Sequence, residues 1–229
     1  MTKTKVLGMA IITISVITRA AAPLITAGSD PSENRIRFVD TDVETADRIE
    51  AALPHASRML ERAMGILDQG WDEMSADDQA SFTKFFDPGK TGEVDQAFIE
   101  EVRANFAKIH SDLHGEITIV YQADAGKCTG MRLFYTDFAR IHVCPYIHEE
   151  KNMGRIARDL AHEMAHISLL VVDRAYFSET DSRYLSLTPH GHWTSDLPVI
   201  GKLAREIARA DTLYHPDAYA RYAAAVVSN

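Results

Sequence analysis

The chain has 229 residues, of which 46% are hydrophobic and 25% charged, so its composition is that of an ordinary globular protein with a sizeable core. Its 24 Lys and Arg against 33 Asp and Glu give a formal charge of −9, which argues against a nucleic-acid-binding protein because such proteins need a basic surface. The same charge is compatible with an acidic cleft that attracts basic substrates.

The N-terminus has the layout of a secretory signal. Lys3 and Lys5 precede a short apolar run at 6–18, and small residues follow it. The alternative is a membrane anchor, but such a span needs roughly 20 apolar residues and Arg19 ends this run earlier. We therefore expect a secreted or periplasmic protein that keeps no membrane anchor after signal cleavage. The expected segments are a signal peptide at 1–22, a linker at 23–41 and a functional domain at 42–229.

Three segments of the first half have the periodicity of helices. The first runs from 42 to about 67 and contains Pro54, so we expect either a kink or two consecutive helices there. A short helix is expected at 75–86, with Ser75 as its N-cap. The segment 93–113 is the best amphipathic helix of this half.

The middle of the chain is predicted to form strands. Runs at 116–123, 131–136 and 140–147 are rich in β-branched and aromatic residues, and the last two flank a tight turn, which indicates a hairpin. In such a hairpin Cys128 and Cys144 lie close to facing positions. Export favours a disulfide between them, and two buried free thiols are the alternative.

The segment 152–172 predicts a helix with one apolar stripe, and it contains the sequence His-Glu-Met-Ala-His at 162–166. Residues four apart lie on one helix face, so His162 and His166 can bind the same zinc ion. Glu163 is then placed to take a proton from water and pass it to a leaving amine. The alternative is a chance match on an ordinary helix, but the long helix, its apolar flanks and the export signal favour a zinc site.

A catalytic zinc site needs a third protein ligand and one open position. The continuation typical of metzincins is excluded because its third histidine would stand where the chain has Val172. Glu206 on a following segment and Asp181 shortly after the helix are both candidates. His190 and His192 could also line the cleft or compete as ligands, although solvated loop histidines are the simpler interpretation.

The paired sequences at 162–166 and 178–184 resemble those of the aspzincins, the deuterolysin and lysine-specific metallo-endopeptidase family, whose second motif reads Gly-Thr-x-Asp-x-x-Tyr. The likeness extends in order over about 45–227. Three further stretches carry it, at 83–109, 128–145 and 215–226.

This resemblance implies a role for each motif residue. His162, His166 and Asp181 would be the ligands of one zinc ion, with no organic cofactor. Glu163 would be the general base, and Tyr184 would donate its hydroxyl to the oxyanion of the tetrahedral intermediate.

We therefore expect an α+β, zincin-like fold, mainly helical, with a small antiparallel sheet beside the helix that carries the histidines. The expected function is that of a zinc metalloendopeptidase acting on protein or peptide substrates as a monomer. The family name suggests cleavage at lysine, for which Glu179 is a candidate pocket residue. The competing hypothesis is a catalytically silent protein-binding domain, because Ser178 and Glu179 replace the Gly-Thr of the second motif.

Overall fold

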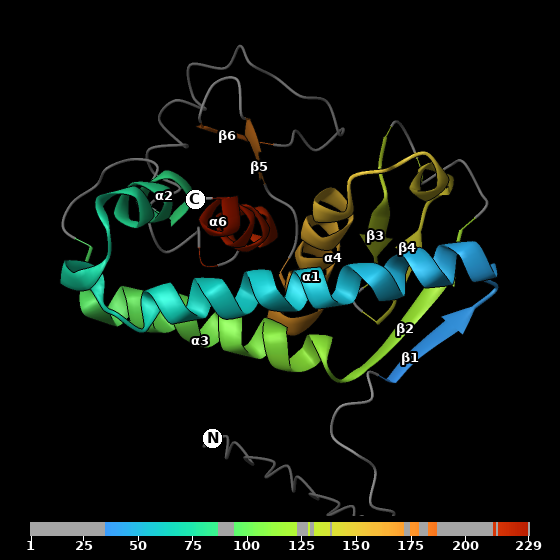
Figure 1. Ribbon diagram of the computed structural model, residues 1–229, viewed down its shortest axis with the longest axis horizontal. Coiled ribbons are helices and arrows are strands. Elements are labelled where there is room, and N and C mark those ends of the chain that lie inside the picture. Colours follow the sequence, from blue (N-terminus) through green and yellow to red (C-terminus); the bar gives the residue numbers. More distant parts are fainter. Residues whose placement is uncertain are drawn as a thin grey trace, which may run out of the picture. The chain divides into compact units, whose positions relative to one another are not determined.

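Figure 1 shows the computed structural model. The described residues all belong to the unit Ser32–Asn229. They are 35–86, 94–122, 128, 131–137, 139–171, 175–178, 183–186, 213 and 215–228. For residues 35, 175–178 and 183–186 only the backbone is described.

Four helices make most of the fold: α1 (Val43–Leu67), α3 (Gln96–Leu113), α4 (Met153–Leu169) and α6 (Pro216–Ser228). The shorter helical elements are η1 (Trp71–Glu73), α2 (Ala76–Phe86) and η2 (Pro145–His148). Side-chain caps define several helix starts: Asp42 precedes α1, Asp95 precedes α3 and Asn152 precedes α4, each accepting a hydrogen bond from a backbone amide three residues on. The predicted cap at Ser75 is confirmed, since its hydroxyl accepts from the Asp78 amide at 3.2 Å.

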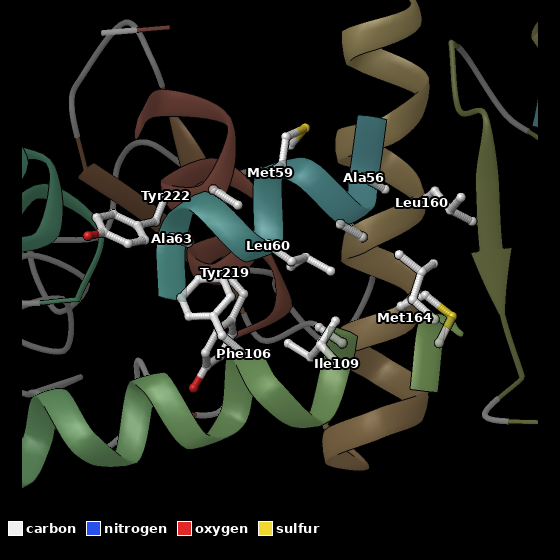
Figure 2. Packing of buried hydrophobic residues seen from close by; sticks show 14 of the residues in the cluster. Ala56, Met59, Leu60, Ala63, Phe106, Ile109, Leu160, Met164, Tyr219 and Tyr222 are labelled. Atoms are coloured by element: carbon white, nitrogen blue, oxygen red, sulfur yellow. The ribbon is translucent and has the colours of Figure 1, made fainter. Parts of the chain in front are cut away.

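The core lies where α1, α3, α4 and α6 meet (Figure 2). The Phe106 ring of α3 packs against Tyr219 and Tyr222 of α6, with ring centroids 5.0 and 5.9 Å apart. The buried Tyr219 hydroxyl accepts from the Asn105 amide at 2.7 Å and donates to the Leu213 carbonyl at 3.0 Å. These aromatic contacts and the satisfied hydroxyl hold α6 against the other helices.

A four-stranded sheet adjoins the helices, in the order β1-β2-β4-β3. Its strands are β1 (Arg35–Val39), β2 (Glu116–Tyr121), β3 (Phe134–Thr136) and β4 (Ile141–Val143). The predicted β3–β4 hairpin is confirmed, and the edge strand β3 lies against α4. A second, two-stranded antiparallel sheet joins β5 (Ala175–Ser178) and β6 (Arg183–Ser186).

The mainly helical α+β class is confirmed, but the larger sheet is mixed instead of antiparallel. The pairs β1–β2 and β2–β4 are parallel. The helices α1, α2 and α3 separate β1 from β2 in the chain, and the antiparallel strand β3 brings the chain back between β2 and β4. Residues 35–39, which the sequence places in a linker, form strand β1 of this sheet.

Of the two alternatives expected at Pro54, two consecutive helices is wrong, since α1 is one helix from Val43 to Leu67. The other alternative, a kink within that helix, stays a prediction. Pro54 lies on the exposed side of α1, where water can satisfy the carbonyl that its ring leaves without an amide partner. The buried side of α1 packs on α3, α4 and α6 along its length. This packing outweighs the local cost of the proline.

The predicted disulfide between Cys128 and Cys144 is confirmed; it joins the end of β4 to the chain before β3. In the part of the chain that the structure describes, no helix has the length and apolar character needed to cross a membrane. The predicted signal segment at 1–22 lies outside the described residues.

Candidate metal centre

Helix α4 carries the central residues of the predicted site. His162, Glu163 and His166 are 9%, 7% and 5% exposed, so all three side chains are buried in the fold. The stripe of Ile156, Leu160 and Met164 packs into the core and sets the rotation of the helix. The periodicity of the sequence therefore identified this helix correctly, and the structure places both histidines on one side of it.

The two imidazoles face each other through their Nε2 atoms, which lie 3.2 Å apart. Two zinc–nitrogen bonds of 2.0–2.1 Å at a tetrahedral angle place their nitrogens about 3.3–3.4 Å apart. A nitrogen pair this close requires a proton or a cation between the two atoms. The spacing of the pair therefore fits a tetrahedral metal without rearrangement of α4.

The other ring nitrogen of His166 is held by the backbone. Its Nδ1 lies 2.8 Å from the Val171 carbonyl, which can only accept, so Nδ1 carries the proton and the Nε2 of a neutral ring has its lone pair available. The contact depends on how α4 ends. Leu170 adopts a left-handed conformation with φ +55°, which turns the chain so that the carbonyl of the next residue reaches back to the ring.

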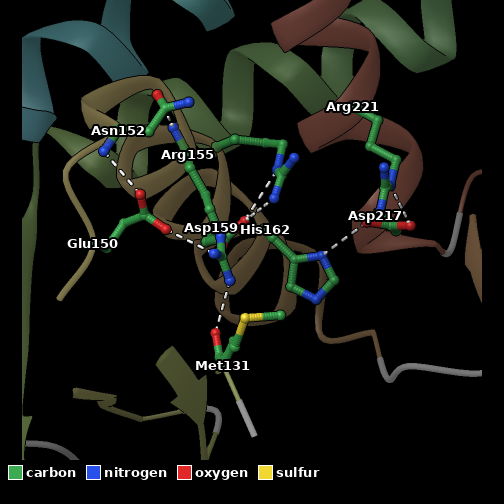
Figure 3. A network of polar contacts seen from close by, with 9 residues as sticks. Met131, Glu150, Asn152, Arg155, Asp159, His162, Asp217 and Arg221 are labelled. Carbon is green, nitrogen blue, oxygen red and sulfur yellow. Dashed lines mark hydrogen bonds and ion pairs between the residues drawn. The ribbon is translucent and has the colours of Figure 1, made fainter. Parts of the chain in front are cut away.

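Helix α6 supplies the partner of the other histidine (Figure 3). Asp217 Oδ1 lies 3.7 Å from His162 Nδ1, and its Oδ2 accepts from Arg221 Nε at 2.7 Å. The Asp217 side chain is buried, so the acidic group and the imidazole interact away from bulk water. Histidines that bind a metal commonly direct the other ring nitrogen at a carboxylate or a carbonyl, as both do here.

Asp217 was missed in the sequence. It lies 51 residues beyond His166 in chain order, and no spacing rule connects the two. The available signal was the stretch at 215–226, which resembles the closing helix of the aspzincins and contains this carboxylate. Only the packing of α6 on α4 brings the group to the site.

A second set of polar contacts anchors the start of α4 (Figure 3). Arg155 donates to Glu150 Oε2 at 2.6 Å and to the Met131 carbonyl at 2.7 Å, and it lies 3.6 Å from Asp159 Oδ2. The Glu150 side chain is 10% exposed, so this ion pair is shielded from solvent. The contacts link α4 to the chain before β3 and to the segment after η2.

The predicted third ligand cannot be placed. Asp181, its alternative Glu206 and the loop histidines His190 and His192 all lie outside the described residues, as does Glu179. The backbone of Tyr184 belongs to β6, where it pairs with Phe177 of β5. The roles predicted for Asp181 and Tyr184 therefore stay predictions.

Among solved structures, the chain is similar to a zinc peptidase from Grifola frondosa, with a TM-score of 0.51 and 12% sequence identity. The match covers 80% of this chain and 96% of that one. At this identity the likeness concerns the fold, and it confirms the zincin-like architecture. No protein-family profile matches the chain, and no curated protein matches it either.

Proposed function

We propose that this chain is an exported zinc metalloendopeptidase that cuts internal bonds of protein or peptide substrates. The observation that carries the proposal is the buried pair of Nε2 atoms 3.2 Å apart, next to a buried glutamate on the same helix. The zincin-like fold supports it, because the neighbour in fold is described as a zinc peptidase. The disulfide between Cys128 and Cys144 supports export.

His162 and His166 would hold one zinc ion through Nε2, with Asp181 as the third protein ligand. Asp217 and the Val171 carbonyl would keep the two rings in the orientation and tautomer that leave those nitrogens available. Bound zinc supplies Lewis acidity, which makes water acidic enough to serve as a nucleophile near neutral pH.

The remaining steps belong to the side chains. The Glu163 carboxylate takes the proton of the attacking water and donates it to the leaving amine as the peptide bond breaks. Burial of Glu163 keeps this proton transfer out of bulk solvent. The Tyr184 hydroxyl donates a hydrogen bond to the oxygen that becomes negative during attack.

Edge strand β3 offers a place for the substrate. It ends the four-stranded sheet and lies against α4, so an extended peptide paired with β3 would run beside the histidine helix. Addition of a substrate strand to an exposed sheet edge is a common way for proteins to bind peptides. Cleavage next to lysine, with Glu179 as the pocket residue, is the specificity we propose.

A digest tests the function. The zinc-loaded mature protein is incubated with an unfolded protein, and the new termini are mapped by mass spectrometry beside Glu163→Gln and the exposed surface control Glu101→Gln. We expect Glu163→Gln to lose at least about 100-fold in rate while keeping its zinc, and the control to cut normally. Cuts that persist in Glu163→Gln contradict the role of that residue.

The altered second motif supports one competing function, that of a silent binding domain. Zinc that is lost in the His162→Ala, His166→Ala variant, without any cleavage of varied unfolded substrates, would favour it. No cleavage and a zinc content that this variant leaves unchanged would show that the histidine pair is part of an ordinary helix. Lysine beside most mapped cuts would support the proposed specificity, and unbiased flanking residues would contradict it.

A further inference from the structure

A second histidine pair lies at the C-terminal end of α3, with His110 in its last turn and His114 as its C-cap, away from the helix that carries the proposed zinc site. His110 and His114 are one turn apart and face α1, which lies beside α3 in Figure 1. Glu61 of α1 completes the group, and one ligand atom from each of the three residues lies within 4.8 Å of the others. Among the described residues, this is the one group of three His, Cys, Asp or Glu side chains whose ligand atoms lie close enough to share one ion.

The three side chains converge on one hydroxyl. Ser57 Oγ lies 3.0 Å from His110 Nε2, 3.0 Å from His114 Nε2 and 2.9 Å from Glu61 Oε1. His110 Nε2 also lies 3.1 Å from the same Glu61 oxygen. The Nε2 atoms therefore point to a common place between the two helices, with the buried serine at its base.

The group has the charge and access that a cation site needs. The Glu61 carboxylate accepts a hydrogen bond from the Ser57 hydroxyl at 2.9 Å and lies 3.1 Å from His110 Nε2, so an acidic oxygen adjoins the imidazoles. The Glu61 and His110 side chains are 54% and 23% exposed, which leaves the group open to an ion from solvent. Because the Glu61 and His114 side chains are exposed, they can rotate to bring their ligand atoms within bonding distance of a shared ion.

We infer that Glu61, His110 and His114 form a second site for a divalent transition metal, with zinc as the best-suited ion. Two imidazoles and one carboxylate are ligands that zinc accepts, and water would fill the fourth position. This inference does not depend on the proposed peptidase site. The alternative is that Ser57 simply organises a hydrogen-bonded cluster on the surface.

A metal here would connect α1 to α3. Both helices pack against α4, which carries the proposed active site. The ion would therefore hold together two of the helices that support α4. A ligand that binds the folded chain alone stabilises it according to its concentration relative to Kd. At 100 times Kd, this corresponds to a rise of about 5–10 °C in Tm for a domain of this size.

The test counts zinc per chain in the full-length mature protein after equilibrium dialysis against buffered micromolar zinc. The variant is His114→Ala, which changes an exposed residue, and the matched control is His55→Ala, an exposed histidine on α1 outside the group. We expect His114→Ala to bind one zinc fewer than the wild type and to lose the corresponding rise in Tm. The control should keep both.

A His162→Ala, His166→Ala variant separates the two sites. If the inference holds, this variant still binds one zinc, and adding His114→Ala removes it. Equal zinc content in the wild type and His114→Ala overturns the inference, and so does a double variant without bound zinc that keeps its fold by circular dichroism. Failure of the peptidase proposal alone would leave the zinc that depends on His114 in place.

Discussion

The Asp217→Asn variant tests how the proposed zinc ligands are oriented. The substitution keeps the size of the side chain but removes the negative charge that lies 3.7 Å from His162 Nδ1. Changing such a partner of a metal-binding histidine typically costs 10–100-fold in metal affinity, or about 1.4–2.7 kcal/mol. Because 3.7 Å is longer than a hydrogen bond, we expect the lower end, about a tenfold loss.

Arg221→Gln is the matched control. Both substitutions disrupt the 2.7 Å contact between Arg221 and Asp217, but only Asp217→Asn removes the carboxylate that faces His162. We expect both variants to lose about 1–3 kcal/mol of unfolding free energy in urea titrations. Zinc affinity, measured by competition with a chromophoric chelator, should fall in Asp217→Asn and change by less than about threefold in Arg221→Gln.

Two results would refute this reasoning. Unchanged zinc affinity in Asp217→Asn would mean that the carboxylate does not orient His162. An equal loss of affinity in Arg221→Gln would mean that the ion pair acts through the docking of α6 and not through the imidazole. Either result would mean that Asp217 does not orient the His162 imidazole in the proposed site.

Three further predictions concern stability. Leu170→Gly should raise the unfolding free energy by about 0.5–1 kcal/mol in urea, since glycine adopts the left-handed conformation of this exposed position without strain; a loss would contradict this. The Cys128→Ser, Cys144→Ser variant should lose about 3 kcal/mol, because the disulfide closes a loop with a sequence separation of 16, and an unchanged Tm would refute that estimate. Burial raises the pKa of Asp137, but hydrogen bonds from His142 and the amides of its turn outweigh this and hold the pKa well below the usual 3.8. Losing these hydrogen bonds in Asp137→Ala should cost about 1–2 kcal/mol at pH 7. Urea titrations should show the difference from wild type shrinking as the pH falls below about 3.8, because the unfolded wild-type chain then takes up a proton that the native carboxylate, with its lowered pKa, does not yet bind. A difference that is constant down to pH 2 would contradict the assignment.

Local features were predictable because they depend on neighbours in the chain. The spacing of apolar residues located α3 and α4, and the separation of four residues placed His162 and His166 on one helix face. The two cysteines around a predicted hairpin, together with the export signal at the N-terminus, predicted the disulfide. For the helices and the hairpin, one short window of sequence contains the cause of the structure.

The sequence-based predictions were wrong where packing against distant parts of the chain overrides the conformational preference of a short segment. Pro54 normally interrupts a helix, yet α1 continues because its buried side packs on three other helices. Residues 35–39 follow a polar, turn-rich stretch, and only the register with β2 identifies them as a strand. The pattern of one segment carries no information about which partner will cover it.

The sequence by itself determined the two histidines and the glutamate of the candidate site, since an α-helix brings residues four apart together wherever it lies. Tertiary structure alone decided what surrounds them. Asp217 reaches His162 because α6 docks on α4, and Glu61 meets His110 because α1 lies along α3. About 50 residues separate the two members of each pair in the chain. Their distance in the fold is set by the burial of apolar helix faces, to which the polar groups themselves contribute little.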